Sequence, residues 1–142
     1  MKNKRERRGF TLIELMVVIL IVGILAAVAV PILRGRIEAA KWSEGKAAMG
    51  SIATAIRAWC AEKGINYTGA FPATLTELGF VAGDCTGTYF ADADFTFAVT
   101  AIGPPPQFTV SSTGGSQTGG PTTPAGGYTL TGNANGTTTW SP

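Results

Sequence analysis

Residues 8–33 read RGFTLIELMVVILIVGILAAVAVPIL, the most distinctive stretch of the chain. From Phe10 to Leu33, 24 residues carry a single charge, the carboxylate of Glu14. As an α-helix this segment would be about 36 Å long, enough to cross the hydrocarbon core of a bilayer. A charge at membrane depth costs roughly 2.5–3.5 kcal/mol on insertion scales, so a partner or a task is expected for Glu14. The stretch therefore predicts a membrane-spanning helix whose one acid serves assembly rather than anchoring.

A basic leader precedes the apolar stretch. Residues 1–8 hold five basic side chains and one acid. Together with RGFTLIEL at residues 8–15, the leader resembles the class III signal sequence of type IV pilins and type II secretion pseudopilins. The resemblance implies that a prepilin peptidase cleaves between Gly9 and Phe10, and that the new Phe10 amine is N-methylated. It covers residues 5–33 strongly and FPATLTEL at residues 71–78 weakly.

Glu14 is the fifth residue of the chain that this cleavage would leave, one helical turn from the new amino group. An ammonium and a carboxylate neutralise each other, within one chain or between neighbouring chains. Pairing between neighbours would fix the axial register of a fibre, and this gives Glu14 a role in assembly. The alternative is that Glu14 only stabilises the helix start through the helix dipole.

Gly23 and Pro31 fall where pilins of this kind carry a helix-loosening glycine and a kinking proline. Proline removes one backbone hydrogen bond and tends to kink a helix, and glycine lowers helix stability. The resemblance implies that the helix unwinds between these residues when it packs into a fibre. The alternative is that both residues are simply common in membrane helices.

An ordinary secretory signal peptide is the competing interpretation of the N-terminus. The basic start, the apolar run and Ala27-Val28-Ala29 satisfy its general pattern. However, Glu14 would interrupt its apolar core, and the helical pattern continues past Ala29. The sequence therefore favours a helix that stays attached after processing.

Removal of residues 1–9 changes the charge balance. The whole sequence has 11 basic and 9 acidic residues, a net charge of +2. Without the first nine residues, 6 basic and 8 acidic residues remain, a net side-chain charge of −2. The basic character belongs to the leader, so no nucleic-acid contact can be inferred from it. Five basic residues before the apolar run, against Arg34 and Arg36 after it, favour a cytoplasmic N-terminus.

The helical pattern becomes amphipathic beyond Pro31. Charged residues mark some faces, while apolar residues recur at about helical spacing, namely Ile37, Met49, Ile52, Ile56 and Trp59. Lys63 followed by Gly64 is a typical helix end, with a cation in the last turn and a glycine after it. One helix from Phe10 to Lys63 is predicted, and its second half should pack under a globular head.

The head begins with a loop at residues 64–83, in which Thr74 and Glu77 form a capping-box pattern for a short helix. From Asp94 the apolar period changes to two, which predicts short antiparallel strands with one buried face. The expected strands lie around Phe95–Val99, Phe108–Val110 and Tyr128–Leu130, with a weaker fourth at Thr137–Trp140. The predicted fold class is α+β: a long N-terminal α-helix packed on a small antiparallel β-sheet head, the pilin fold that the resemblance implies.

The connections between these strands also have clear signals. Residues 104–106 are three prolines and should form a stiff connection, while Asn135-Gly136 favours a tight turn. Residues 111–127 are rich in glycine, serine, threonine and proline, which predicts a long exposed loop. No charged residue follows Asp94. Such an uncharged surface suits contact with neighbouring subunits, a solid substrate or attached glycans, or is a plain solvated loop.

Cys60 and Cys85 are the only cysteines. The resemblance implies export to an oxidising space, where they could form one intramolecular disulfide. The bridge would close a loop of 26 residues, a stabilisation of roughly 3 kcal/mol in the chain-entropy model. Two free buried thiols are the alternative.

No catalytic site or cofactor is expected. The chain has no histidine, so the commonest general base is missing, and there is no paired-cysteine metal motif. Asp84, Asp92 and Asp94 are close enough in sequence to hold calcium, although their spacing does not fit an EF-hand loop. The sequence thus predicts a protein that is not an enzyme, with calcium binding as an open alternative.

Together with these observations, the resemblance implies a structural subunit of a type IV pilus fibre. The expected parts are a leader at 1–9, a transmembrane and polymerisation helix at 10–33, the amphipathic half of the helix at 34–63, and the head at 64–142. The implied partners are other pilin subunits, the prepilin peptidase and N-methyltransferase, the pilus assembly machinery, and the inner membrane before assembly. A pseudopilin of a type II secretion system, with a periplasmic filament, and an exported soluble binding domain are the alternatives. Adhesion, motility, DNA uptake and electron transfer all stay open as the fibre's task.

Overall fold

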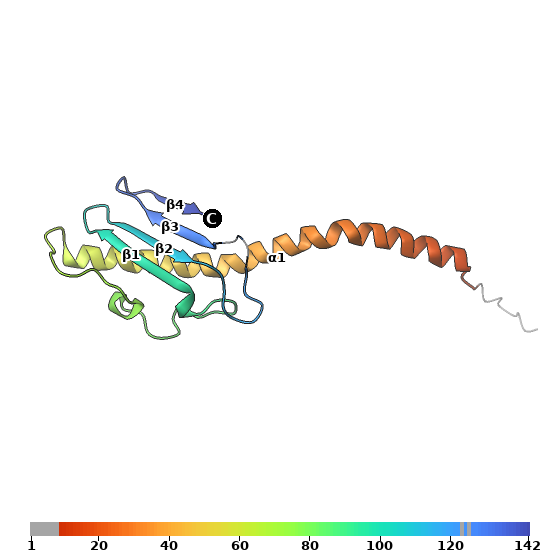
Figure 1. Ribbon diagram of the computed structural model, residues 1–142, viewed down its shortest axis with the longest axis horizontal. Coiled ribbons are helices and arrows are strands. Elements are labelled where there is room, and N and C mark those ends of the chain that lie inside the picture. Colours follow the sequence, from red (N-terminus) through yellow and green to blue (C-terminus); the bar gives the residue numbers. More distant parts are fainter. Residues whose placement is uncertain (1–8, 123, 125) are drawn as a thin grey trace, which may run out of the picture. The chain divides into compact units, whose positions relative to one another are not determined.

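The computed structural model describes residues 9–122, 124 and 126–142. The basic side chains of the predicted leader, at residues 1–8, lie outside the described residues. The elements shown in Figure 1 are α1 (Leu12–Lys63), η1 (Leu75–Leu78), η2 (Asp92–Asp94), β1 (Phe95–Ala101), β2 (Gln107–Ser112), β3 (Tyr128–Gly132) and β4 (Thr138–Ser141). One long N-terminal helix packs on a four-stranded antiparallel sheet, so the predicted α+β class is confirmed.

Helix α1 contributes to both compact units of the chain, Met1–Ile37 and Glu38–Pro142. In the described part of the first unit, every residue is exposed. The most apolar 18-residue window of α1 has a mean hydropathy of 3.1 and none of it is buried, so the helix is apolar and long enough to cross a membrane. The helix runs through Gly23 and Pro31 and begins at Leu12, two residues after the predicted start.

The sheet of the second unit is a simple meander in the order β1-β2-β3-β4, with each strand antiparallel to the next. The predicted alternation is confirmed in the first three strands, which bury Phe95, Val99, Phe108, Val110 and Leu130. The fourth strand forms at Thr138–Ser141, one residue later than predicted, and is exposed along its length.

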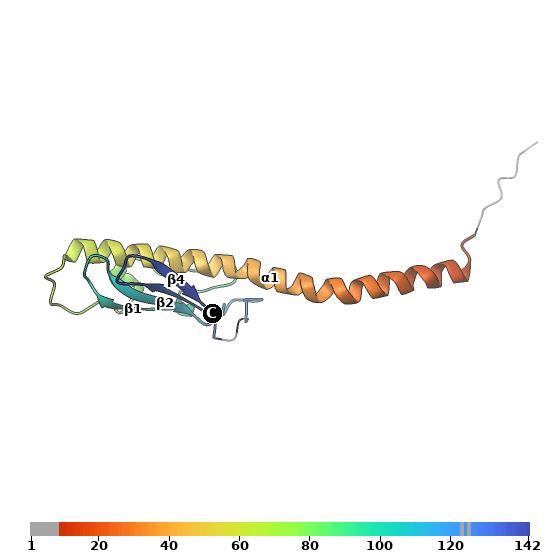
Figure 2. The same cartoon turned by 90° about the horizontal axis from the view of Figure 1, so that it is seen from above.

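The core of the second unit lies between the sheet and the C-terminal half of α1 (Figure 2). Trp42 of α1 is nearly fully buried, with its ring centroid 5.2 Å from that of Phe90 and 4.8 Å from that of Tyr128. One turn along the helix, Gly45 lies directly against the Phe90 ring: a Cβ at Gly45 would be 2.5 Å from Cζ of Phe90. The helix therefore needs a residue without a side chain at this point.

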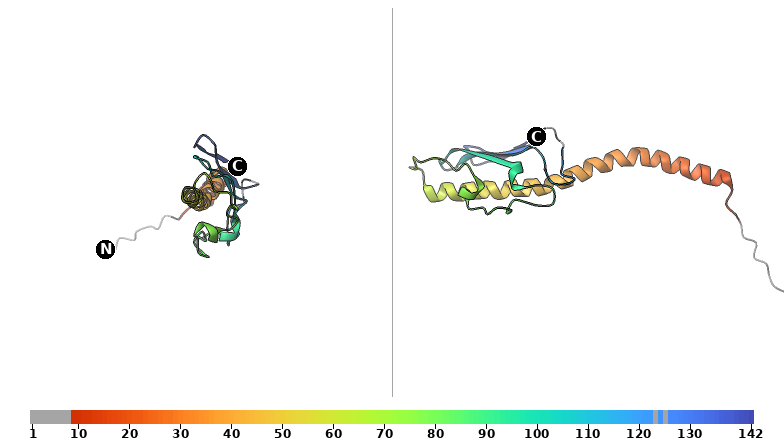
Figure 3. Two further views of the ribbon diagram at one scale, coloured as in Figure 1. Left: turned by 90° about the vertical axis from the view of Figure 1, so that its left-hand side faces the viewer. Right: turned by 60° about the horizontal axis from the view of Figure 1, so that its bottom comes forward.

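Glu44 fixes the neighbouring segment to the same helix. Its Oε1 atom accepts hydrogen bonds from the backbone N–H groups of Tyr89, at 2.8 Å, and Phe90, at 3.2 Å. Figures 1 and 3 show the green segment around η1 on one side of α1, with β3 and β4 on the other. Glu44 and Gly45 together thus hold the segment that leads from η1 into the sheet.

The predicted helix signals are confirmed. Helix α1 ends at Lys63, and Gly64 has a left-handed φ of +74° and donates its N–H to the Cys60 carbonyl at 3.0 Å. Thr74 and Glu77 form the predicted capping box at η1. Between β3 and β4, Gly136 has a φ of +83°, and its N–H donates to the Asn133 carbonyl at 3.0 Å. Among the described residues only glycines have positive φ, so Asn135-Gly136 does not form the mirror-image two-residue turn.

The predicted long exposed loop at residues 111–127 needs correction. Its first two residues belong to β2, and Ser112, Pro121 and Gly127 are buried. The loop folds back because acidic side chains from elsewhere in the unit hold its backbone. Asp94 accepts hydrogen bonds from the Ser116 N–H at 2.8 Å and hydroxyl at 2.9 Å, and Glu38 accepts one from the Thr122 N–H at 3.3 Å. Composition predicted the loop but not these contacts, which join residues far apart in sequence.

Candidate functional site

The start of α1 is organised by Thr11. The Glu14 N–H donates to the Thr11 hydroxyl oxygen at 3.3 Å, and the Leu15 N–H donates to the Thr11 carbonyl at 3.3 Å. The Thr11 hydroxyl is also 3.5 Å from Oε2 of Glu14, a long and weak hydrogen bond. Sequence reasoning did not single out Thr11, although Thr-x-x-Glu before an apolar run is itself a capping-box pattern that could have identified it.

The Glu14 side chain is exposed and lies in the first turn of α1. An ionised carboxylate has about four acceptor positions, and the Thr11 hydroxyl takes up at most one of them. Most of the hydrogen-bonding capacity of Glu14 is therefore open to a group from outside the chain. The helix-dipole alternative also agrees with this position, so the geometry permits both roles.

The predicted cleavage junction lies just before the helix. Gly9 and Phe10 are outside α1 and exposed, and Phe10 retains 73 % of its accessible surface. A peptidase must bind its substrate in an extended form, and backbone outside a helix meets this requirement without unwinding. The junction and the open carboxylate of Glu14 thus lie within five residues of each other at the start of the predicted mature chain. Cleavage and methylation themselves stay predictions.

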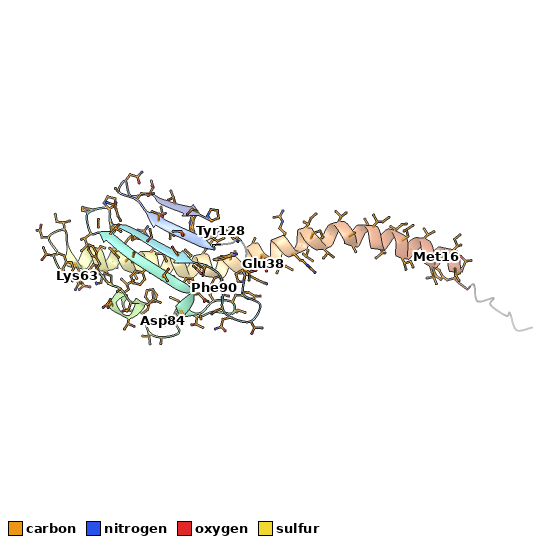
Figure 4. All side chains as sticks on the ribbon, viewed as in Figure 1. Met16, Glu38, Lys63, Asp84, Phe90 and Tyr128 are labelled. Atoms are coloured by element: carbon orange, nitrogen blue, oxygen red, sulfur yellow. The ribbon has the colours of Figure 1, made fainter. Side chains whose placement is uncertain are left out.

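The surface that follows is apolar on all sides. The exposed fraction is at least 47 % for each large apolar residue between Phe10 and Leu33. Figure 4 shows these side chains, with Met16 labelled, standing out from the helix. A soluble monomer rarely exposes more than a few hundred Å² of continuous apolar surface. This part of α1 therefore needs an apolar environment, either lipid or other helices.

Gly23 and Pro31 both lie within this apolar part of α1. A Cβ at Gly23 would meet no atom within 4 Å, so no close contact inside the chain demands a glycine there. Pro31 is inside the helix, where it cannot donate a backbone hydrogen bond. Neither residue has a packing role in the chain itself, and their predicted loosening role stays a prediction.

Cys60 and Cys85 are free thiols in the structure, exposed by only 3 % and 7 %. The predicted bridge is therefore not seen, and the arrangement matches the alternative of two buried thiols; the bridge stays a prediction for the exported protein. Burial raises the pKa of the Cys60 thiol. Burial also raises the pKa of Cys85, and the nearby charges of Asp92 and Asp84 add to this. Both cysteines belong to the same core cluster.

The three aspartates considered for calcium, Asp84, Asp92 and Asp94, each accept hydrogen bonds from backbone N–H groups. Asp92 accepts hydrogen bonds from the Gly83 N–H at 2.6 Å, the Cys85 N–H at 3.0 Å and the Thr86 hydroxyl at 3.0 Å. The bond from Gly83 is the main reason that the pKa of Asp92 lies below its usual range. In the part of the chain that the structure describes, no three His, Cys, Asp or Glu side chains gather where they could hold a metal ion.

The N-terminal geometry agrees with what the chain resembles. Residues 4–30 match the family described as "Prokaryotic N-terminal methylation motif". The chain is 38 % identical over 96 residues to the type IV major pilin protein PilA of Myxococcus xanthus, which covers 61 % of this chain and 44 % of that protein. It is 36 % identical over 97 residues to the type IV major fimbrial protein FimA of Dichelobacter nodosus, which covers 66 % of this chain and 52 % of that protein.

A third relative comes from a secretion system. The chain is 47 % identical over 54 residues to the type II secretion system core protein G of Pseudomonas aeruginosa, covering 38 % of each chain. The chain thus spans about half or less of the length of these curated relatives. No solved structure matches it significantly.

Proposed function

From the methylation motif and the relatives, which support the family of type IV pilins and type II secretion pseudopilins for this chain, we propose that it is the structural subunit of a type IV pilus fibre. The observation that carries the proposal is the N-terminus of α1. An accessible junction, an open carboxylate and a long unburied apolar helix follow one another there within residues 9–33. These are the features that a helix needs if it is first held in a membrane and later packed against its own copies.

Processing would create the second partner of the ion pair. Hydrolysis of the Gly9–Phe10 bond by a prepilin peptidase leaves an ammonium on Phe10, and methylation of this amine keeps its charge. Glu14 of one subunit would then accept this group from a neighbouring subunit. An unpaired carboxylate in an apolar environment is unfavourable. A membrane-held subunit would therefore be drawn to the register in which Glu14 is paired.

The rest of the chain would serve this assembly. Before assembly, α1 would anchor the subunit in the inner membrane with its N-terminus in the cytoplasm, because five basic residues precede the apolar run. The head would lie on the opposite side of that membrane and later on the outside of the fibre. Separate assembly machinery would supply the work of extraction, so the chain has a structural role without catalysis.

A pseudopilin is the second candidate. Of the three relatives described above, the secretion-system protein has the highest identity to this chain, 47 %, although over the shortest alignment, 54 residues. The same N-terminal chemistry would then build a short periplasmic filament. The two functions differ in where the filament ends, outside the cell or in the periplasm.

The test is to delete the gene in its host, restore it on a plasmid, and image the cells by electron microscopy. We expect surface fibres that disappear on deletion and return on restoration. Mass spectrometry of the sheared fibres should find a chain that begins at Phe10 with one added methyl group. Processed protein confined to the periplasm would indicate the pseudopilin. An intact leader, or a chain that begins at Val30, would contradict both.

A further inference from the structure

The outer face of the sheet, which is the face turned away from α1, is built almost entirely from hydroxyl side chains. Strand register places Thr96, Ser111, Thr129 and Ser141 in one row across all four strands. The adjacent row consists of Ala98, Thr109, Thr131 and Thr139. We call these eight residues the hydroxyl face: seven carry a hydroxyl group and the eighth is alanine.

This face is open. Figure 1 looks onto it, with the C-terminal half of α1 behind the sheet, and Figure 2 shows the helix on the other side. In β1 the alternation is plain, because Thr96, Ala98 and Thr100 are exposed while Phe95 and Val99 are buried. The apolar side of the strands already forms the core with α1. The hydroxyl face is therefore not part of this core, and no element of the described chain packs over it as α1 packs over the inner face.

The hydroxyl face has no charge. No Lys, Arg, Asp or Glu follows Asp94, so none occurs on any of the four strands. Solvent-facing sheets commonly carry charged residues, which limit unwanted association. A charged partner would gain no ion pair here and would lose part of the hydration of its charges. A neutral partner has no charges and does not pay this cost. The absence of charge thus favours an uncharged partner.

The spacing of the hydroxyl groups is regular. Neighbouring strands are about 4.8 Å apart, and alternate residues along a strand are about 6.8 Å apart. Each hydroxyl can donate one hydrogen bond and accept others. Several are already oriented: Ser111 Oγ and Thr129 Oγ1 are 3.1 Å apart across the strands, and the Thr96 hydroxyl donates to the Ser111 carbonyl at 3.5 Å. The threonine methyl groups place small apolar areas between these polar ones.

We propose that the hydroxyl face is a docking surface for an uncharged polysaccharide presented as an extended surface. Such a polymer offers the complementary pattern: hydroxyl groups that donate and accept, separated by C–H groups, with no charge. The face has no aromatic side chain on which a single sugar ring could stack, so the match is to an ordered surface of many sugars. One copy gains only a few solvent-exposed hydrogen bonds and binds weakly.

Repetition would make this weak contact useful. If the chain polymerises as proposed above, one fibre presents the hydroxyl face many times. Linked copies can exceed the affinity of a single site by about 10²–10⁴ without any new contact. This inference rests on the proposed function for its biological use, but the surface chemistry can be tested without a fibre.

The experiment uses the chain from Phe10 to Pro142, which is the predicted processed form, in neutral lipid vesicles. These vesicles present many heads whether or not fibres form. The vesicles are sedimented with microcrystalline cellulose, an insoluble uncharged polysaccharide. We expect binding that persists when salt is raised from about 0.05 to about 0.5 M, because only charge-mediated contacts are screened. Binding that salt abolishes would overturn the proposal and indicate adsorption through the charged residues outside the sheet.

The main variant is Ala98→Lys, because Ala98 is exposed and its change removes no hydroxyl group. A lysine there would place an ammonium group in the contact with a neutral surface, where it would lose water without gaining an ion pair. Binding should therefore weaken by roughly tenfold or more. The matched control is Ala61→Lys, the same change at an exposed position on α1. Equal binding by Ala98→Lys and wild type would overturn the proposal.

A second variant covers the case in which Ala98→Lys disturbs the sheet. The double change Thr109→Val and Thr131→Val keeps β-branched side chains and removes two hydroxyl groups from the central strands. It should fold normally by circular dichroism and bind cellulose several-fold less. Unchanged binding would overturn the role of the hydroxyl groups.

Two further outcomes would replace the proposal with another occupant. Wild-type vesicles that clump without cellulose, and do not clump with Ala98→Lys, would show that a second copy covers the face. Sugar mass attached to Thr or Ser of this face, in protein from native cells, would show that covalent glycans cover it. If the host cells form no fibres but vesicles that carry the protein still bind cellulose, the proposed function is refuted and the binding proposal is not.

Discussion

In the first half of α1, from Leu12 to Ile37, every residue is exposed, whereas the second half, from Glu38 to Lys63, buries seven. The first half is the more apolar, yet the second half is the one covered by its own chain. The second half has an apolar stripe that matches the inner face of the sheet, whereas the first half is apolar all round between Leu15 and Leu33. Burial within the chain thus follows the arrangement of apolar residues around the helix rather than their number. A helix that is apolar on all sides needs lipid or other protein chains to cover it.

The largest effect is expected from Glu14→Ala in the exposed half. Losing the carboxylate makes the helix more apolar, so membrane insertion should be unchanged. Assembly should fall by roughly tenfold or more, because the partner for a neighbour's amine is gone. Fibre yield and membrane fractionation measure the two effects separately. Glu62→Ala, at an exposed position in the other half, is the control, and normal fibres from Glu14→Ala would refute the assembly role.

The next effect concerns the end of the buried half, where Cys60 lies. If Cys60 and Cys85 are bonded after export, the bridge should stabilise the head by roughly 3 kcal/mol in the chain-entropy model. Both thiols are buried with raised pKa values, so slow alkylation of the folded protein would not distinguish a bridge from two thiols.

The measurement is therefore alkylation of the exported protein after denaturation, before and after reduction. A bridge predicts no labels before reduction and two labels after it. Two labels before reduction would establish free thiols, as the structure has them. In that case the Cys60→Ser and Cys85→Ser variants should differ from wild type only by the effects of core packing.

Two glycines of the buried half give a direct comparison. Gly45→Ala would bring a Cβ to 2.5 Å from the Phe90 ring, so the core must shift, and overpacking of this kind costs about 1–3 kcal/mol. Gly50→Ala meets no atom within 4 Å, and should stabilise α1 by up to about 1 kcal/mol through helix propensity.

Chemical unfolding of the full chain in detergent, followed by tryptophan fluorescence, measures both changes. The exposed half supplies a further control in Gly23→Ala, which likewise meets nothing within 4 Å and should leave unfolding of the head unchanged. Equal stability of Gly45→Ala and Gly50→Ala would show that the Phe90 ring does not pack closely against Gly45.

The smallest effect is a loss of head stability in acid. The folded pKa values of Asp92, Glu77 and Glu38 are all lowered: for Asp92 mainly by the Gly83 N–H, for Glu77 by the Ala73 N–H and for Glu38 by Lys41. A lowered folded pKa contributes stability above the unfolded value, about 3.9 for Asp and 4.3 for Glu, and this stability is lost as the pH falls through the folded pKa.

Thermal unfolding between about pH 5 and pH 2 should therefore show a falling midpoint for the head. Asp92→Asn should flatten part of this dependence, while Thr118→Ala, in an exposed loop position, should not. The helical signal of the exposed half should change little over the same range. A midpoint independent of pH would contradict the role of these hydrogen bonds.

Local patterns in the sequence predicted most of the fold. Glycine after Lys63, the pair of Thr74 and Glu77, and the two-residue period from Phe95 act over a few residues, and the structure confirms each one. The apolar run from Phe10 predicted the membrane helix for the same reason. Thr11 was detectable too, since its capping pattern needs only Glu14 three residues later.

Contacts between distant residues could not be predicted in this way. Glu44 reaches the backbone at residues 89–90 and Glu38 reaches Thr122, and no local pattern relates such positions. The hydroxyl face is a related case. Each strand showed alternate threonines, but their alignment into two rows depends on the pairing register, which only the folded sheet defines.

The strand order β1-β2-β3-β4 also bears on how quickly the head can form. Each strand pairs with the next one along the chain, and two of the three closing pairs are near in sequence: Ala101 with Gln107, and Gly132 with Thr138. The third, Ser112 with Tyr128, closes a longer loop between β2 and β3. Short loops cost little entropy to close, and local contacts are associated with fast folding. The contact between Trp42 and Tyr128, in contrast, joins residues far apart in the chain. Docking of the sheet on the helix, rather than pairing of its strands, should therefore set the folding rate of the head.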